Sequence, residues 1–282
     1  MDNNNGIGGR LIGALVVAAI GFTMYLAQVQ QNPVTGEKQH VSMSPDQEIR
    51  LGLQSAPEMA HQMGGELSSA DAHEMEVQKI GAFLVANSIA KNSPWKFQFH
   101  VLADTKTINA FALPGGQVFI TMGLLNKLQT EAQLAGVLSH EMGHVIERHS
   151  AEQMAKSQLG QSLIVAVGVG STDPNHPGYA MDATMIASVV NHMVELRYSR
   201  KDESEADMWG LKLMSQAGYN PRAMVQVMEI LKAADDHGHS VEMFQTHPNP
   251  DIRMRDINNY LQEHPPQEGL KDGKNLKDVF ID

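Results

Sequence analysis

The hydrophobic pattern of the chain begins with a long uncharged run near the N-terminus. Residues Leu11–Ala27 carry no charge, and they lie between Arg10 and the polar stretch Gln28–Ser44. At about 1.5 Å per residue, a helix made from this run is just long enough to cross the hydrocarbon layer of a membrane. We therefore expect residues 1–27 to be a single-pass membrane anchor, joined to the rest of the chain by a linker over residues 28–43.

The charges around this run indicate an orientation. Arg10 and the amino terminus place positive charge on its N-terminal side. Because positive flanks tend to stay in the cytoplasm, we expect the rest of the chain to lie on the extracytoplasmic (periplasmic) side of the membrane. The alternative is a protein exported after removal of a signal peptide, for which the best small-residue cleavage site ends at Gly21.

Helical and strand patterns follow one another after the linker. Ser44 and Gln47 are spaced as a capping box, which predicts the start of a helix. Phe97, Phe99 and Val101 alternate with polar residues, as side chains do along a strand. Further helices are expected over residues 71–91, about 130–152, 181–217 and 222–234, and strands over residues 97–101, 108–113 and 118–121.

The order of these elements predicts the fold class. Residues 160–179 are rich in glycine and are expected to form a loop. The many helices and the short group of strands predict a mainly helical α+β domain with a small antiparallel sheet, spanning residues 44–264. Residues 265–282 are polar and are expected to be a loosely ordered tail.

The overall composition narrows the function classes. The 282 residues are 42% hydrophobic, as is usual for a globular protein. A net charge of −11, from 21 basic and 32 acidic residues, argues against a nucleic-acid partner. The chain has no cysteine, which excludes disulfide bonds, thiolate metal sites and cysteine nucleophiles. A metal site would have to use histidines and carboxylates.

The segment HEMGH at residues 140–144 carries the clearest chemical signal. Residues four apart on a helix lie side by side, so His140 and His144 can bind one zinc ion. Glu141 is rotated roughly 100° from His140, beside the metal, where it can take a proton from the attacking water. The plain alternative is a helix with two surface histidines. Against it, an apolar stripe adjoins the histidine face and indicates a packed helix: Leu134, Val137, Leu138 and Val145.

The sequence after this motif does not supply a third ligand. His149 is nine residues after His140, which places it on the opposite side of a helix that continues to about residue 152. A third ligand is therefore expected from a second helix.

The acidic segment SRKDESEAD at residues 199–207 can supply that ligand. Glu203 and Asp207 fall on the apolar stripe of the expected helix, whereas Glu205 lies well off it. Buried carboxylates are costly unless they are paired or bound to metal. We therefore predict that Glu203 is the third zinc ligand and that Asp207 orients one of the histidines. An acidic helix start, favourable to the helix dipole, is the alternative.

These motifs together resemble a known group of zinc metallopeptidases. H-E-x-G-H, followed by E-x-x-x-D within S-R-x-x-E-x-E-A-D, is similar to the gluzincin family of the CaaX prenyl proteases, the HtpX-type heat-shock proteases and the Oma-type quality-control proteases. The segment NAFALPGG at residues 109–116 resembles the strand before the motif helix in that family. Thr246-His247-Pro248, followed by Arg253, resembles its C-terminal segment. The resemblance covers about residues 44–260 and implies a zincin-like fold.

The resemblance also implies roles for four further residues. Asn109 and Ala110 would bind the substrate backbone by strand addition; a plain strand with a buried asparagine is the alternative. His247 would lie near the metal, as a hydrogen-bond donor to the oxyanion or as a transient fourth ligand, with Arg253 supporting it. The alternative is a structural histidine before a proline.

We therefore expect a membrane-anchored zinc metalloendopeptidase with one Zn²⁺ per chain. Its partners would be polypeptide substrates, in particular unfolded or misfolded proteins in quality control, and it would bind no nucleic acid. The alternative is a membrane-tethered, chaperone-like binding protein that keeps the same fold but cleaves little. The presence of Glu141 beside the expected ligands favours the enzyme.

Overall fold

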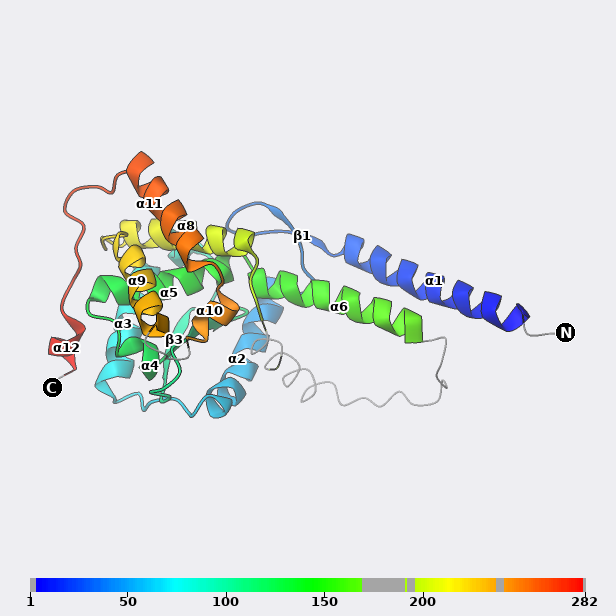
Figure 1. Cartoon of the computed structure of the whole chain (residues 1–282), viewed down its shortest axis with the longest axis horizontal. Helices are drawn as coiled ribbons and strands as arrows, with labels where there is room; N and C mark the ends of the chain where they lie inside the picture. The colour runs from blue at the N-terminus through cyan, green and yellow to red at the C-terminus, as the bar shows by residue number, and fades with distance from the viewer. Residues whose placement is uncertain (1–3, 169–190, 192–195, 237–240, 281–282) are drawn as a thin grey trace.

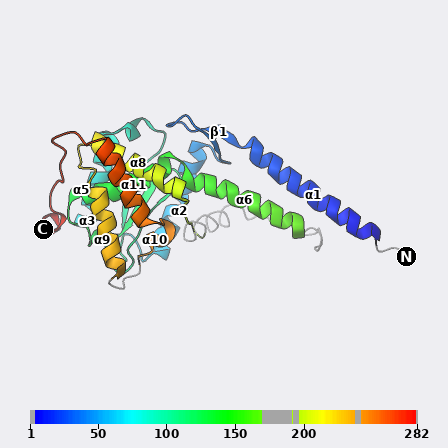
Figure 2. The ribbon, with the colours of Figure 1, turned by 45° about the horizontal axis from the view of Figure 1, so that its top comes forward.

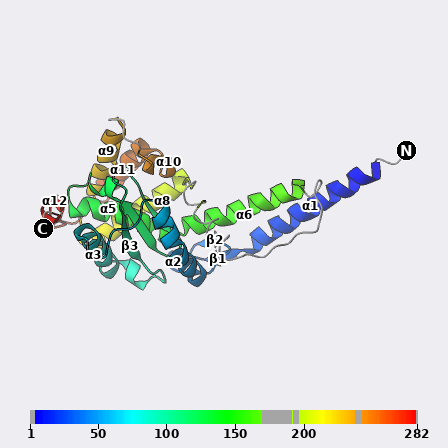
Figure 3. The same ribbon diagram turned by 90° about the horizontal axis from the view of Figure 1, so that it is seen from below.

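A computed structural model of the chain describes residues 4–168, 191, 196–236 and 241–280. Two helices, α1 (Asn4–Ala27) and α6 (His149–Gly168), lie side by side and project together from a rounded body (Figure 1). The same arrangement is seen after a turn of 45° (Figure 2) and from below (Figure 3).

The uncharged N-terminal run forms most of α1. Several of its large apolar side chains are exposed, and Leu15 and Met24 are 69% and 60% accessible. Within the part of the chain that the structure describes, no helix combines the length and the apolar character needed to cross a membrane.

The segment expected to be a linker forms a hairpin instead. Strands β1 (Val29–Gln31) and β2 (Lys38–His40) pair in antiparallel fashion. The buried side-chain amide of Asn32 donates to the carbonyl of Ile146 at 2.8 Å, and that of Gln39 donates to the carbonyl of Glu147 at 2.6 Å. The hairpin therefore satisfies carbonyls that the end of helix α5 leaves without a partner.

Two helices and a 3₁₀ turn precede the main sheet. Ser44 and Gln47 form the expected capping box at the start of the first helix, and Pro45 occupies its first turn. Asp71 caps the second helix, which ends at Ala86, earlier than expected. The three elements are α2 (Pro45–Gln62), α3 (Ala72–Ala86) and the 3₁₀ turn η1 (Ile89–Asn92).

The main sheet has the strand order β3-β5-β4, with β3 (Gln98–Leu102), β4 (Ala110–Leu113) and β5 (Gln117–Thr121). The tight turn at Gly115 makes β4 antiparallel to β5, whereas β3 is parallel to β5. The prediction of an antiparallel sheet is therefore wrong for the pairing of β3 with β5. The reason is the path of the chain. After β3 the chain crosses to the far edge of the sheet and forms β4. It then turns at Gly115, and β5 runs back between β4 and β3 in the same direction as β3. Strand β4 is left at an edge of the sheet.

The remaining helices build the body around α5 (Glu131–Ile146), whose residues from Ala132 onward are all buried. This helix ends earlier than expected, because Arg148 has a left-handed backbone (φ 59°) and α6 starts in a new direction at His149. Among the described residues, the other helices are α4 (Met122–Leu125), α8 (Arg200–Gln216), α9 (Ala223–Asp236), α10 (Met243–Thr246), α11 (Pro250–Glu263) and α12 (Leu276–Val279).

Two other expectations for this half of the chain differ from the structure. Residues 160–168, expected to be loop, continue α6, while 169–179 and the start of the helix expected over 181–217 lie outside the described residues. The tail expected to be loose packs onto the body. Leu276 is fully buried, and Asn275 forms a bridge with Thr130, the residue that caps α5.

Helices α5 and α8 pack unusually closely at Gly143. A Cβ atom on Gly143 would lie 2.8 Å from the carbonyl oxygen and 2.9 Å from the Cα of Ala206 on α8. Those are backbone atoms, which cannot move aside as a flexible side chain can. The absence of a side chain at Gly143 therefore sets the distance between the two helices.

Replacing Gly143 by alanine is expected to force α8 away from α5 and to lower the free energy of unfolding by about 1–3 kcal/mol, as overpacking does. Gly136→Ala on the same helix is the matched control. Its new Cβ would meet only side-chain atoms of Met224 and Met214 and the Cα of Met224, none closer than 3.2 Å. Urea unfolding followed by circular dichroism measures both variants, and equal losses would show that the contact at Gly143 does not limit the packing.

Candidate active site

Helix α5 directs the two motif histidines toward α8. Their Nε2 atoms are 3.1 Å apart, and both rings are buried. Glu203, in the first turn of α8, places its carboxylate oxygens 3.6 Å from His140 Nε2 and 3.5 Å from His144 Nε2. The structure therefore brings together the three residues that the sequence predicts as zinc ligands.

His247 completes a group of four side chains around one point. Its Nδ1 lies 2.9 Å from Glu203 Oε1 and 3.3 Å from His140 Nε2. One ligand atom from each of the four residues falls within 4.8 Å of the others. His247 follows α10 directly, and this short helix brings it into the site from a distant part of the sequence.

The geometry of the group fits a metal ion of the kind that histidine and carboxylate bind. Ligand atoms about 2.0–2.2 Å from a tetrahedral zinc lie roughly 3.3–3.6 Å from one another, close to the separations between His140, His144 and Glu203. Burial lowers the pKa of His144 well below its ordinary value, so its ring is neutral, as a ligand must be. Burial alone would raise the pKa of Glu203, but the Arg253 guanidinium and His247 outweigh it and lower that pKa. Glu203 is therefore ionised.

Asp207 lies one turn after Glu203 and contacts His140 from the other side of its ring. Asp207 Oδ1 is 3.0 Å from His140 Nδ1, so this nitrogen can donate to it while Nε2 faces the cluster. Arg253 donates two hydrogen bonds to Asp207, at 2.8 and 2.6 Å, and its Nη1 lies 2.7 Å from Glu203 Oε2. Although burial opposes it, Arg253 holds the pKa of Asp207 well below the ordinary range. Arg253 thus links the predicted third ligand to the predicted orienting residue.

His144 has an outer partner that the sequence reasoning missed. Its Nδ1 lies 2.9 Å from Nδ1 of the buried His149, and His149 Nε2 lies 3.3 Å from Glu205 Oε2. If Nε2 of His144 faces a metal, its Nδ1 donates to His149, which in turn donates to Glu205. The prediction placed His149 on the opposite side of a continuing helix. That reasoning was wrong because α5 ends at Ile146, and no residue pattern marked the left-handed turn at Arg148.

Tyr198 is a second residue that sequence reasoning missed. Its ring stacks on that of His144, with centroids 3.8 Å apart, and its hydroxyl lies 3.1 Å from Ser150 Oγ. The backbone N–H of Tyr198 donates to the carbonyl of Thr246 at 2.9 Å. Tyr198 therefore covers the ring of His144 and fixes the segment that carries His247.

Glu141 lies beside the cluster and is fully buried. Neither of its carboxylate oxygens has a hydrogen-bond partner among the described residues, and His247 Nε2 lies 3.7 Å from Oε1. Burial raises the pKa of Glu141. A buried carboxyl group without a partner is costly, and such groups gather where a protein takes up and releases protons.

Asn109 and Ala110 lie where the chain enters the edge strand β4. The carbonyl of Asn109 accepts from the Thr121 N–H of β5 at 3.0 Å. Because neighbouring residues of an antiparallel strand direct their backbone groups to opposite sides, the N–H and C=O of Ala110 and Ala112 face away from β5. The side-chain amide of Asn109 lies 3.5 Å from Glu242 Oε2. The two predicted substrate-binding residues are therefore at an edge of the sheet, and both are buried.

Comparisons with known proteins agree on one family. The model of peptidase family M48 matches residues 71–261, more than half of the chain. The mitochondrial metalloendopeptidase OMA1 of Schizosaccharomyces pombe is 32% identical over 255 residues, which cover 90% of this chain and 72% of that protein. The beta-barrel assembly-enhancing protease of Escherichia coli is 30% identical over 196 residues, 67% of this chain and 39% of that protein. The metalloendopeptidase OMA1 of Danio rerio is 28% identical over 259 residues, 89% of this chain and 53% of that protein. The chain thus spans about half or less of the length of the last two relatives.

The two glutamates of α8 are expected to differ in their effect on metal binding. Glu203→Ala removes a carboxylate from the centre of the cluster and should lower the affinity for zinc more than 100-fold. Glu205→Ala leaves the cluster intact and acts only through His149, so we expect a loss of about 10-fold or less. Loss of a direct partner of a ligand costs about 10- to 100-fold, and Glu205 is one step further from the cluster than such a partner, so its loss should cost no more than the lower end of that range.

Metal content after dialysis, together with competition against a zinc chelator, measures both variants. Asp207→Asn, which weakens the contact to His140, should fall between them. A metal-free Glu205→Ala protein beside a metal-replete Glu203→Ala protein would contradict this assignment of the ligands.

Proposed function

Because the chain belongs to peptidase family M48 and is therefore a metalloprotease, we propose that it is a zinc-dependent endopeptidase that cleaves unfolded or misfolded polypeptides in protein quality control. The observation that carries the proposal is the convergence of His140, His144 and Glu203 beside Glu141, a buried carboxyl group without a partner. A bound zinc ion would polarise the scissile carbonyl and increase the acidity of the attacking water.

Glu141 moves the proton in this proposal. It takes a proton from the attacking water and passes it to the nitrogen of the leaving amine. Its raised pKa suits the first step, because a carboxylate with a raised pKa accepts a proton more readily than an ordinary glutamate.

His247 stabilises the charge that develops on the substrate. Burial acts to lower the pKa of His247, but Glu203 and Glu141 outweigh it and raise that pKa, so the donor form is favoured. Its Nε2 has no hydrogen-bond partner among the described residues and is free to donate to the oxyanion. Arg253 positions Glu203 and Asp207, and through Asp207 it positions His140.

The edge strand holds the substrate. A peptide paired with β4 would form backbone hydrogen bonds with Ala110 and Ala112, which requires an extended and therefore unfolded segment. Asn109 fixes the start of this strand through its bonds to Thr121 and Glu242.

Glu141→Gln is expected to keep the bound metal and to lower the rate of cleavage of reduced, denatured protein by about 10²–10⁴-fold, because the amide cannot accept the proton. Glu152→Gln, a half-buried glutamate of α6 in a surface ion pair with Lys156, is the control and should cleave normally. A Glu141→Gln protein with normal turnover would remove Glu141 from the mechanism. If the unmodified protein prevents aggregation but cleaves nothing, the chaperone-like alternative holds.

We also propose that α1 attaches the body to a membrane as a single-pass anchor, with the body on the extracytoplasmic side. Support comes from the exposed apolar side chains along this helix, which projects away from the body. In water such a surface is costly, and a lipid environment would remove the cost.

The full chain is expected to stay with the membrane fraction after carbonate extraction, whereas a chain that begins at residue 28 should be released. A reporter fused after Asp282 should behave as an exported protein. An N-terminus mapped to Phe22 in the mature protein would show cleavage instead, and an intact chain recovered in the soluble fraction would contradict the anchor.

A further inference from the structure

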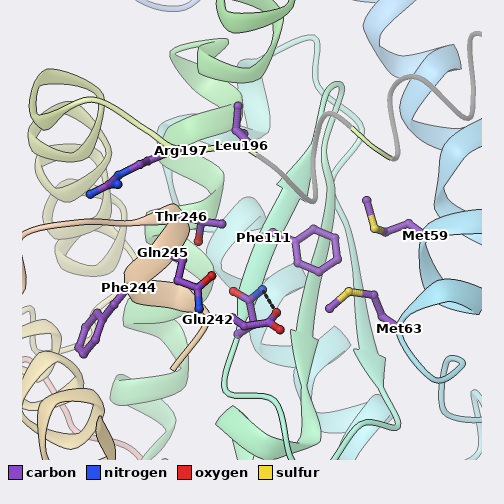
Figure 4. A pocket seen from close by; sticks show the side chains of 10 residues that line it. Met59, Met63, Phe111, Leu196, Arg197, Glu242, Phe244, Gln245 and Thr246 are labelled. Atoms are coloured by element: carbon purple, nitrogen blue, oxygen red, sulfur yellow. Dashed lines mark hydrogen bonds between the residues drawn. The ribbon is translucent and has the colours of Figure 1, made fainter. Parts of the chain in front are cut away.

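A pocket of about 720 Å³ lies between α2, the edge strand β4 and the segment around α10 (Figure 4). Its volume is within the range of about 300–1,000 Å³ that is usual for ligand sites. It is lined by Met59, Met63, Asn109, Phe111, Leu196, Arg197, Glu242, Phe244, Gln245 and Thr246.

Two segments of the pocket wall continue directly into the proposed active site. Arg197 directly precedes Tyr198, which stacks on His144, and Thr246 directly precedes His247. The Tyr198–Thr246 hydrogen bond ties these two segments of the wall together. A third wall is the strand that we propose binds the substrate.

The face of the sheet toward this pocket is apolar. Phe111 points to the side of the sheet on which α2 packs, in one apolar cluster with Met59 and Phe119. Its neighbours Ala110 and Ala112 belong to the cluster on the other side, with α5. Figure 4 shows Met59 and Met63 reaching from α2 toward Phe111. Phe111 is held in place by stacking on Phe119, with ring centroids 5.0 Å apart.

This arrangement decides which substrate side chains meet the pocket. Side chains of an extended peptide alternate between the two faces of the sheet that it joins. A peptide paired with β4 would therefore direct every second side chain to the face of Phe111. Methionines are flexible and adapt to apolar groups of different shape, so the pocket can accept more than one kind of side chain.

We propose that this pocket receives a large apolar side chain of the substrate, such as leucine, phenylalanine or methionine, at a fixed position near the scissile bond. The proposal rests on the proposed function and adds the class of sequence that the enzyme selects. Polar groups remain at the wall, where Glu242 accepts from Asn109, and Arg197 is exposed. Cleavage therefore occurs in segments that a folded protein keeps in its core.

Cleavage sites in reduced, carboxymethylated protein, mapped by mass spectrometry, are the first test. We expect enrichment of large apolar residues at one fixed distance from the cut. In a pair of fluorogenic peptides that differ only at that position, kcat/KM should be at least 10-fold higher with leucine than with glycine.

Met63→Asp places a charge against the apolar wall and should reduce the preference for leucine at least 10-fold. Met63→Ala removes only part of the wall and should reduce the preference for leucine by a smaller factor. This second variant keeps the test valid if the Met63→Asp protein does not fold. Met75→Asp, at an exposed methionine of α3 outside this pocket, is the matched control and should keep the full preference.

The outcomes separate this proposal from the proposed function. Chelator-sensitive cleavage without an apolar preference, or with a preference that Met63 variants leave unchanged, overturns the pocket assignment alone. A complete lack of chelator-sensitive cleavage by the unmodified protein overturns both.

Discussion

The close contact between α5 and α8 at Gly143 is the constraint on which the site depends. The two histidines belong to α5 and Glu203 belongs to α8, so the distance between the helices fixes the size of the cluster. A side chain at position 143 would meet backbone atoms of Ala206. The glycine within the HEMGH motif therefore fixes the position of Glu203 on α8 as much as it shapes the helix that carries it. The HEMGH motif and Glu203 are far apart in sequence, yet the single contact at Gly143 fixes the distance between the two helices that carry them.

Buried carboxyl groups outnumber the buried guanidinium in the site. Glu141, Glu203 and Asp207 are buried together with Arg253. If all three carboxyl groups are ionised, three negative charges and one positive charge leave a sum of −2, and a protonated His247, which Glu203 and Glu141 favour, reduces it to −1. Charges buried in this way are stable only when they are paired or coordinate a metal. A divalent cation would offset the excess of negative charge. Arg253 pairs with Asp207 and Glu203, so Glu141 is the carboxyl group left without a partner among the described residues.

The features of the site that the sequence could indicate depend on local periodicity. The spacing of His140 and His144, and the apolar stripe that distinguishes Glu203 from Glu205, are properties of single helices, and the structure brings these residues together as the spacing indicates. Features that depend on where a helix stops could not be predicted. His149 contacts His144 only because Arg148 adopts a left-handed backbone after α5. Nor could the spacing show that polar Asn32 and Gln39 are buried, because their partners are backbone carbonyls more than 100 residues away.

In the proposed function, two neighbouring features of the molecule would select the same kind of substrate. Pairing with β4 requires a segment whose backbone is extended and free of other partners, because Ala110 and Ala112 offer only N–H and C=O groups. The pocket at Phe111, as proposed, would require a large apolar side chain in the same segment. A folded protein satisfies its backbone in its own secondary structure and buries such side chains in its core. An unfolded chain exposes both at once, so the edge strand and the pocket, acting as proposed, would together discriminate against folded proteins without any contact that reads a specific sequence.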